Sequence, residues 1–217
     1  KYVREGETVL DLGSGAGKIC FIASQVVGKN GRVIGVDMND SMLDVANKFA
    51  PVVAETIGFA NVEFHKGNIV DMRDLVEDDS IDVVVSNCVL NLVSNNEKPD
   101  LFQELFRVVK PGGRAVISDI VSNSDVPTEM QEDDYLWSGC ISGAMKDNVF
   151  VRAFEDAGFD EILVVKHETE PWQTVNDIEF RSMTVVACKA DVDGNTDMGP
   201  TPKEGGDCCC SSDSGCC

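Results

Sequence analysis

The sequence predicts an α/β domain in which a doubly wound, mostly parallel sheet carries helices on both faces. Short apolar strands alternate with segments of helical period along most of the 217 residues. The first predicted strand ends in a glycine-rich turn, Gly13-Ser14-Gly15-Ala16-Gly17, and the second ends in the acidic residue Asp37. Ligands bind such sheets beyond the carboxyl ends of the strands. We therefore expect one domain over residues 1–190, with its binding site where these two strands end.

In the first part of the chain, strands and helices are expected to alternate. The predicted strands are short apolar or alternating runs bounded by turns, at Val9–Leu12, Arg32–Val36 and Asn61–His65. The predicted helices have apolar residues at helical spacing, at about Lys18–Val27 and Asp40–Ile57. Because proline has no backbone N–H and its ring crowds the preceding turn, Pro51 should kink or break the second helix.

The second part of the chain continues the alternation and completes the sheet. Strands are expected at Ile81–Ser86, Arg114–Val121, Glu161–Lys166 and Phe180–Lys189, and helices at Leu101–Val109, Thr128–Trp137 and Asn148–Ala157. Lys110-Pro111-Gly112-Gly113 should end the first of these helices in a turn. The last two strands are expected to form a hairpin at the sheet edge, which gives seven strands. Apolar periodicity stops at Asp191, so residues 191–217 are predicted to be a disordered tail.

The net charge and the apolar runs exclude two classes of partner. The formal net charge is −20. Because proteins bind phosphate backbones by neutralising them with Lys and Arg, nucleic acid is not an expected partner. No apolar run approaches the roughly 20 residues that span a bilayer, so no membrane partner is expected either.

The cysteines indicate a reducing compartment. Of nine cysteines, Cys20, Cys88, Cys140 and Cys188 are scattered through the predicted domain, and the other five crowd into the last ten residues. This spacing fits neither a secreted disulfide framework nor a zinc site built from paired Cys-x-x-Cys motifs. We therefore expect a cytoplasmic protein, whose oligomeric state the sequence leaves open.

The glycine turn is not of the dinucleotide-binding type. That pattern, Gly-x-Gly-x-x-Gly, would need glycine at position 18 or 20, where the chain has Lys18 and Cys20. The spacing Asp11-x-Gly13-x-Gly15-x-Gly17 instead resembles the first motif of class I S-adenosylmethionine-dependent methyltransferases. The resemblance implies a Rossmann-like, seven-stranded methyltransferase sheet and S-adenosyl-L-methionine as the cofactor, with its amino-acid end on the glycine loop.

The same pattern implies the other cofactor contacts. Asp37 would accept hydrogen bonds from the ribose hydroxyls, or else cap the helix that begins near Asp40. Asn68 and Ile69 would hold the adenine, or else act as a helix cap and a core residue. The complete set of expected cofactor-binding residues is Asp11, Gly13, Ser14, Gly15, Gly17, Asp37, Met38, Asn68, Ile69, Asn87 and Val89.

Three stretches of sequence around cysteines are more specific. Taken singly, Cys20, Cys88 and Cys140 are each more typical of small buried apolar residues. Together, Gly-Ser-Gly-Ala-Gly-Lys-Ile-Cys, Ser-Asn-Cys-Val-Leu-Asn-Leu and Leu-Trp-Ser-Gly-Cys-Ile-Ser-Gly-Ala resemble the arsenite methyltransferase family, over about Val9–Val186. The resemblance implies that Cys140 binds trivalent arsenic and that Cys20 takes part in thiol exchange and substrate handling, both as catalytic residues. It also leaves room for glutathione or thioredoxin as a reductant.

The chemistry of arsenic agrees with these residue types. Trivalent arsenic is a soft centre, and thiolates are the ligands that hold soft centres. Arsenic bound to sulfur keeps a lone pair that can attack the methyl carbon of the cofactor's sulfonium, so no general base is required. The protein's task is then mainly to position the reactants.

The chain departs from the family at one arsenic ligand. A further arsenic-binding cysteine of the family lies before the last strand, where this chain has Ile178. Isoleucine cannot bind arsenic, so methylarsenite or a thiol-bridged species is favoured over arsenite. Vicinal thiols in the tail are candidate replacements that would deliver arsenic to Cys140 and Cys20; they are Cys208, Cys209, Cys210, Cys216 and Cys217.

Two other functions stay open from the sequence. A methyltransferase of the quinone-biosynthesis kind would act on a small organic substrate, but it usually needs a base near the fourth strand. Asn87 and Cys88, which follow that strand, offer none with a suitable pKa. A thiol-rich, non-catalytic metalloid-binding protein is the third possibility, because the tail is rich in cysteine and the third ligand is missing.

Overall fold

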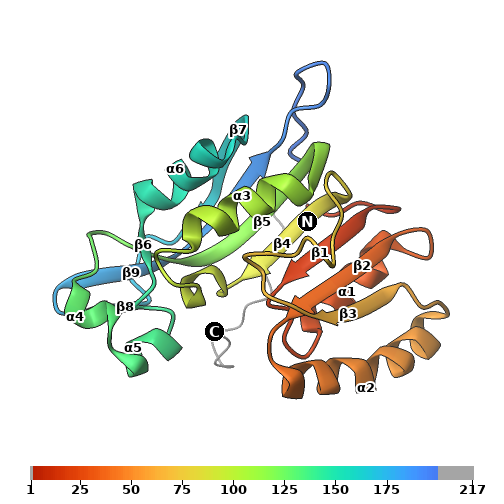
Figure 1. The fold of residues 1–217 in the computed structure, drawn as a ribbon, viewed down its shortest axis with the longest axis horizontal. Helices are drawn as coiled ribbons and strands as arrows, with labels where there is room; N and C mark the ends of the chain where they lie inside the picture. The colour runs from red at the N-terminus through yellow and green to blue at the C-terminus, as the bar shows by residue number, and fades with distance from the viewer. Residues whose placement is uncertain (1, 200–217) are drawn as a thin grey trace.

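The computed structural model describes residues 2–199, which form one sheet with helices on both sides (Figure 1). The main path of the sheet runs β3-β2-β1-β4-β5-β9-β7, while β6 and β8 pair only with β5 and β9. The strands are β1 (Thr8–Leu12), β2 (Arg32–Asp37), β3 (Val62–Lys66), β4 (Ile81–Asn87), β5 (Val109–Ser122), β6 (Met145–Lys146), β7 (Glu161–His167), β8 (Gln173–Val175) and β9 (Ile178–Cys188). Strands β1 to β5 pair in parallel, and β9 runs antiparallel to β5 and β7. The predicted fold class, with seven principal strands, is confirmed.

The helices cover the sheet in two groups. They are α1 (Lys18–Val27), α2 (Asp40–Ile57), the 3-10 helix η1 (Leu90–Leu92), α3 (Lys98–Val108), α4 (Thr128–Gln131), α5 (Asp134–Ser138) and α6 (Asp147–Ala157). Helix α1 packs near α2, and α3 packs against α6. Successive strand side chains point to opposite faces, so Val9 joins the cluster under α1 while Leu10 joins the large core with α3 and α6.

Two prolines lie inside elements. Pro51 does not break α2, and Pro111 lies within β5, although α3 ends at Val108, just before the Lys-Pro-Gly-Gly stretch, as predicted. Helix α2 continues through Pro51, because the packing of α2 on β2 and β3 holds both halves in place. Strand β5 already begins at Val109 and includes Pro111. There the register shifts, with Ile81 opposite Val109 and Val83 opposite Arg114, so the Lys-Pro-Gly-Gly stretch is an irregularity within the strand and not a separate turn.

Two local features were missed by the sequence analysis. The single helix predicted at Thr128–Trp137 is split, because the Asp133 side chain accepts hydrogen bonds from the amides of Tyr135 and Leu136 and so caps a new helix. Strand β8 was not predicted. Asn176 and Asp177, with φ of 50° and 64°, connect it to β9 in a two-residue hairpin turn.

Within residues 191–199, which the prediction places in the tail, Asp197 and Met198 contact the domain. The Arg4 guanidinium donates two hydrogen bonds to the Asp197 carboxylate, at 2.5 and 2.6 Å. The Met198 sulfur lies 3.5 Å from the Cys188 sulfur. The predicted disorder of the remaining tail, and its five cysteines, concern residues outside those that the structure describes.

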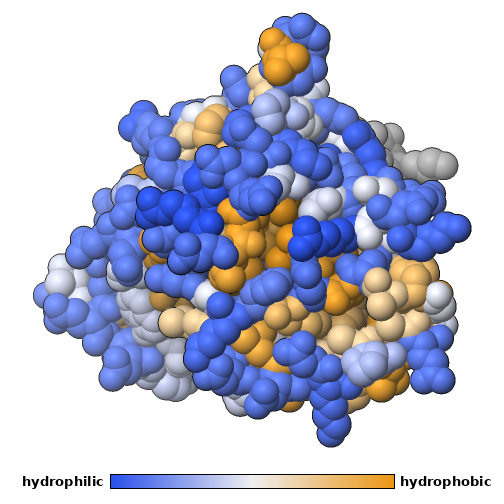
Figure 2. Space-filling view, turned by 45° about the vertical axis from the view of Figure 1, so that its right-hand side comes forward, coloured by the Kyte–Doolittle hydropathy of each residue, from blue (hydrophilic) through white to orange (hydrophobic). Residues whose placement is uncertain are grey.

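The surface carries apolar residues despite the strongly acidic composition. On the face shown in Figure 2, hydrophobic surface gathers in the middle and is bordered by hydrophilic residues. Of the apolar residues of α2, Leu43 and Ala46 are buried, whereas Met42, Val45 and Phe49 are exposed. Among the described residues, no helix is both long and apolar enough to cross a membrane.

Candidate active site

The glycine turn after β1 forms an open floor at the end of the sheet. The amides of Gly13 and Ser14 donate to the Val36 carbonyl at 2.8 and 3.1 Å, which ties the turn to β2. Gly13 has φ of 67°, and a Cβ there would lie 2.5 Å from the methyl groups of Val89. A Cβ on Gly15 would meet no atom within 4 Å. The backbone at Gly15 is therefore accessible to a ligand.

A cleft of about 450 Å³ adjoins this floor. Six of the expected cofactor residues line it, namely Gly13, Asp37, Met38, Asn68, Ile69 and Val89. The other expected residues, Asp11, Ser14, Gly15, Gly17 and Asn87, are not among its lining residues. Six lining residues were not expected, namely Gly67, Val70, Leu92, Val93, Ser94 and Glu97. The only feature of the sequence that could have indicated these residues is that they follow the ends of β3 and β4.

Asp37 organises the glycine turn from the end of β2. Its two carboxylate oxygens accept hydrogen bonds from the amides of Asn39 and Gly15, each at 2.8 Å. The helix cap that was the alternative for Asp37 is supplied by Asn39, whose side chain accepts from the amides of Ser41 and Met42. Asp37 is thus not used as the helix cap, and it lines the cleft.

Asn68 and Ile69 lie in a local turn at the wall of the cleft. The Asn68 side chain accepts a hydrogen bond from the Val70 amide at 3.1 Å, which stabilises a local turn. Ile69 is part of the large core cluster. Both residues also line the cleft. The local turn therefore holds them at the wall of the cleft.

Cys20 lies beneath the glycine turn and not beside Cys140. It is fully buried, and its thiol donates to the Asp11 carboxylate with 3.2 Å between sulfur and oxygen. Burial raises the pKa of Asp11 to about 7, and burial together with the Asp11 charge raises the pKa of Cys20. Cys20 and Cys140 belong to separate core clusters. The structure therefore does not bring these two cysteines together in one cluster, and their shared role in arsenic binding stays a prediction.

Cys140 lies on a strained loop that contacts the end of β4. It follows α5 and has φ of 59°, in the left-handed region that non-glycine residues seldom adopt. Its sulfur lies 3.4 Å from the carbonyl oxygen of Cys88, which has φ of 56°. Val89, the next residue, lines the cleft. The two most specific stretches of the sequence thus meet beside the cleft.

Asn91 and Lys98 hold the Cys140 loop from below. The Asn91 side-chain amide donates to the carbonyls of Ile120 and Cys140, at 2.7 and 3.1 Å. The Lys98 ammonium donates to the Gly143 carbonyl and to Asn95. Burial lowers the pKa of Lys98 to about 8, although the Asp119 charge opposes this shift. These hydrogen bonds fix the backbone at Cys140 and at Gly143.

Comparison with known proteins shows the family of this chain. Residues 4–158 match the family described as methyltransferase domain. This chain belongs to the methyltransferase domain family. It is 40% identical over 165 residues to an arsenite methyltransferase of Aquipseudomonas alcaligenes, covering 76% of this chain and 47% of the relative. An arsenite methyltransferase of Halobacterium salinarum is 44% identical over 158 residues, covering 72% and 38%.

A solved structure of an arsenic methyltransferase has a similar fold. The crystal structure of CrArsM, an arsenic(III) S-adenosylmethionine methyltransferase from Chlamydomonas reinhardtii, matches with a TM-score of 0.79 and 32% identity, over 88% of this chain and 66% of that chain. The resemblance to arsenite methyltransferases and the prediction of a methyltransferase are confirmed. The chain spans less than half the length of the two curated relatives named above.

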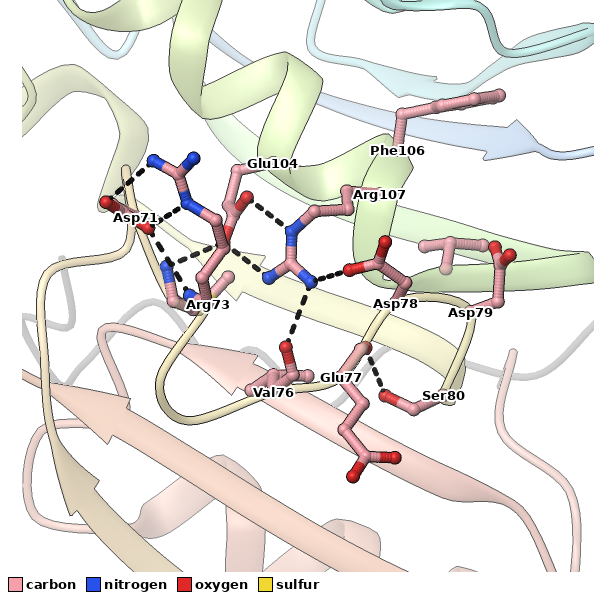
Figure 3. A network of polar contacts seen from close by, with 12 residues as sticks. Asp71, Arg73, Val76, Glu77, Asp78, Asp79, Ser80, Glu104, Phe106 and Arg107 are labelled. Carbon is pink, nitrogen blue, oxygen red and sulfur yellow. Dashed lines mark hydrogen bonds and ion pairs between the residues drawn. The ribbon is translucent and has the colours of Figure 1, made fainter.

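In this methyltransferase domain, the loop between β3 and β4 is fastened to α3 (Figure 3). One Glu104 oxygen accepts from the Met72 amide and from Arg107, both at 2.6 Å. Arg107 also donates to the Val76 carbonyl at 3.0 Å and to Asp78 at 2.5 Å. Its hydrogen bond to Glu104 is the main cause that raises the pKa of Arg107. The fastened loop carries Asn68 and Ile69 at the cleft.

Replacing Arg107 with methionine is expected to lower the free energy of unfolding of the methyltransferase domain by about 2 kcal/mol, because Glu104 loses its buried partner. Cofactor binding should weaken in parallel, since the loop at Asn68 is less well held. Urea unfolding and calorimetric titration would measure the two effects. Arg73→Met is the matched control, because its ion pair with Asp71 is exposed and should contribute little. Equal behaviour of the two variants would contradict the assignment.

Asp119 is expected to give the domain a pH-dependent stability. Burial raises its pKa from 3.8 to about 6, against the lowering effect of hydrogen bonds from the amides of Ile120, Asn91 and Leu90. The folded state therefore binds more protons than the unfolded state between these values, and stability falls as pH rises through this window. Relative to Asp119→Asn, the free energy of unfolding of the wild type should fall by roughly 2 kcal/mol from pH 3.8 to about 6. Parallel unfolding curves for the two proteins across this range would contradict the prediction.

Proposed function

We propose that this domain methylates trivalent arsenic, with S-adenosyl-L-methionine as the methyl donor. One observation carries the proposal: the Cys140 sulfur lies 3.4 Å from the Cys88 carbonyl, one residue from Val89 at the cleft. A thiol that can hold a soft metalloid is thereby brought next to the site expected for the donor. The similarity to arsenite methyltransferases supports the same activity.

Groups in and beside the cleft suit S-adenosyl-L-methionine. The open space above Gly15 admits the amino-acid end to the backbone, and the buried Ser14 hydroxyl has no hydrogen-bond partner among the described residues. Asp37 would hold the ribose, and Asn68 and Ile69 the adenine, both from the walls of the cleft. When bound, this cofactor supplies an electrophilic methyl group on a sulfonium. The residues of the chain bind and orient it.

Cys140 would hold arsenic through its thiolate and leave the arsenic lone pair available as the nucleophile. Because the nucleophile needs no deprotonation, the site requires no general base. Ile178 lies in the same buried cluster as Cys140 and cannot bind arsenic. We therefore favour methylarsenite, or arsenic already bridged to a small thiol, over free arsenite. Glutathione or thioredoxin would keep the thiols reduced.

The alternatives predict different chemistry at the same site. A methyltransferase for organic nucleophiles needs a base in the cleft, and the acidic residues that line it are Asp37 and Glu97. Asp37 is already bonded to Gly15 and Asn39, and Glu97 accepts a hydrogen bond from Ser94. A metalloid-binding protein without catalysis would bind arsenic but leave the cofactor unchanged.

One assay tests the proposal. The purified chain is incubated with S-adenosyl-L-methionine, glutathione and either arsenite or methylarsenite, and the arsenic products are identified by mass spectrometry. We expect methylated products, faster from methylarsenite, with one equivalent of S-adenosylhomocysteine for each methyl group. Tight binding of arsenic without any methylated product would overturn the proposed catalysis and favour the metalloid-binding alternative.

A further inference from the structure

Two cysteines that are far apart in the sequence meet at one point of the fold. Cys88 follows β4 and Cys140 follows α5, and the Cys140 sulfur lies 3.4 Å from the Cys88 carbonyl oxygen. Cys88 packs against the cluster that contains Cys140, and it is only partly buried. Both residues have a left-handed backbone conformation, which non-glycine residues adopt only where the surrounding structure imposes it.

The backbone under each cysteine is fixed independently. The Cys88 amide donates to the Ser118 carbonyl of β5 at 2.9 Å, and the Cys140 amide donates to the Trp137 carbonyl at 3.0 Å. The Cys140 carbonyl accepts from the Asn91 side chain at 3.1 Å. The backbone that carries each thiol is therefore held by hydrogen bonds that do not involve the sulfurs. Such a pre-organised pair suits a ligand that binds both thiolates.

We propose that Cys88 and Cys140 bind trivalent arsenic together, as a dithiolate site. This inference rests on the proposed function for its substrate class and adds Cys88 as a ligand. With methylarsenite, two arsenic–oxygen bonds break and two arsenic–sulfur bonds form. The two thiol protons leave with the two hydroxides as water, and no oxidant or reductant is needed. The methyl group keeps the third position on arsenic, and the lone pair stays free.

The position of Cys88 also relates the arsenic to the cleft. Val89, its neighbour, lines the cleft and lies against Gly13 of the glycine turn. Cys140 belongs to the buried cluster with Ile141 and Ile178, against which Cys88 packs. An arsenic atom shared by the two cysteines would therefore lie at the boundary between the buried cluster and the cleft, close to the expected methyl donor.

Binding of methylarsenite to cysteine variants tests the pair. The background is the full reduced chain with its five tail cysteines, Cys208, Cys209, Cys210, Cys216 and Cys217, replaced by serine. In this background, Cys88→Ser and Cys140→Ser are compared with Cys188→Ser, a control at a buried position in β9. Calorimetric titration should show that each of the first two variants binds about 100-fold or more weakly, because the chelate is lost. The control should bind like the parent.

Protection from alkylation tests the same pair without any variant at the site. One equivalent of methylarsenite should protect Cys88 and Cys140 together from iodoacetamide, as read by peptide mass spectrometry. Protection of Cys140 alone, or unchanged affinity in Cys88→Ser, would overturn the proposal. The two proposals fail separately. If the parent protein never methylates arsenic but Cys88→Ser loses arsenic binding, the dithiolate site is supported and the proposed catalysis is ruled out. If Cys88→Ser methylates arsenic normally, the proposed catalysis is supported and the dithiolate site is ruled out.

Discussion

Replacing Cys140 with serine is expected to abolish methylation of arsenic and to leave binding of S-adenosyl-L-methionine unchanged. A serine hydroxyl is a hard, weakly acidic group that does not hold trivalent arsenic. Without the thiolate, arsenic is no longer placed at the cleft, and positioning of reactants contributes up to about 7–11 kcal/mol to a reaction of this kind. The rate at saturating cofactor should therefore fall by at least roughly a thousandfold.

The measurement separates loss of the arsenic ligand from general damage. Product formation is followed by mass spectrometry, and cofactor binding by calorimetric titration of the same preparation. Cys188→Ser is the matched control, because Cys188 is buried in β9 beside Met198 and lies outside the cluster of Cys140. Substantial methylation by Cys140→Ser would rule out the proposed role of this thiol. A parallel loss in Cys188→Ser would show that the effect is not specific to the site.

Replacing Gly143 with alanine is expected to displace the Cys140 loop and to destabilise the domain. A Cβ at position 143 would lie 1.9 Å from the Asn91 carbonyl oxygen, well inside any allowed contact. Because that atom belongs to the backbone, either the loop or η1 must move. Overpacking of a buried site costs about 1–3 kcal/mol. The movement also breaks the hydrogen bond from Lys98 to the Gly143 carbonyl, so binding of methylarsenite should weaken.

Gly139→Ala provides the control for the Gly143 prediction. It changes the same loop, but the nearest atoms to its Cβ lie at 3.6 to 4.0 Å, an ordinary contact distance. We expect this variant to unfold at nearly the wild-type urea concentration and to bind arsenic normally. Similar midpoints for Gly143→Ala and wild type, or equal losses in the two variants, would show that the contact with Asn91 does not constrain the loop.

Local sequence patterns were sufficient for the fold and for part of the cleft. Apolar spacing located all seven principal strands, because alternation and helical period report directly on which faces are buried. Asp37 was located by its place at the end of the second strand, and its oxygens do bond the glycine turn at Gly15. The wall residues Leu92, Val93 and Glu97 were not found, because nothing in their own spacing shows that they face Ile69.

By itself, the sequence determined the α/β class, the methyltransferase family and the glycine turn, since these depend on residues close together in the chain. Only the tertiary structure decided the partners of the cysteines. It placed Cys20 against Asp11, and it brought Cys140 to Cys88, across a separation of 52 residues. Such long-range contacts depend on how the loops cross the end of the sheet. They also depend on buried hydrogen bonds, such as the one that the Asn91 side chain donates to the Cys140 carbonyl. Periodicity within one element carries no information about these contacts.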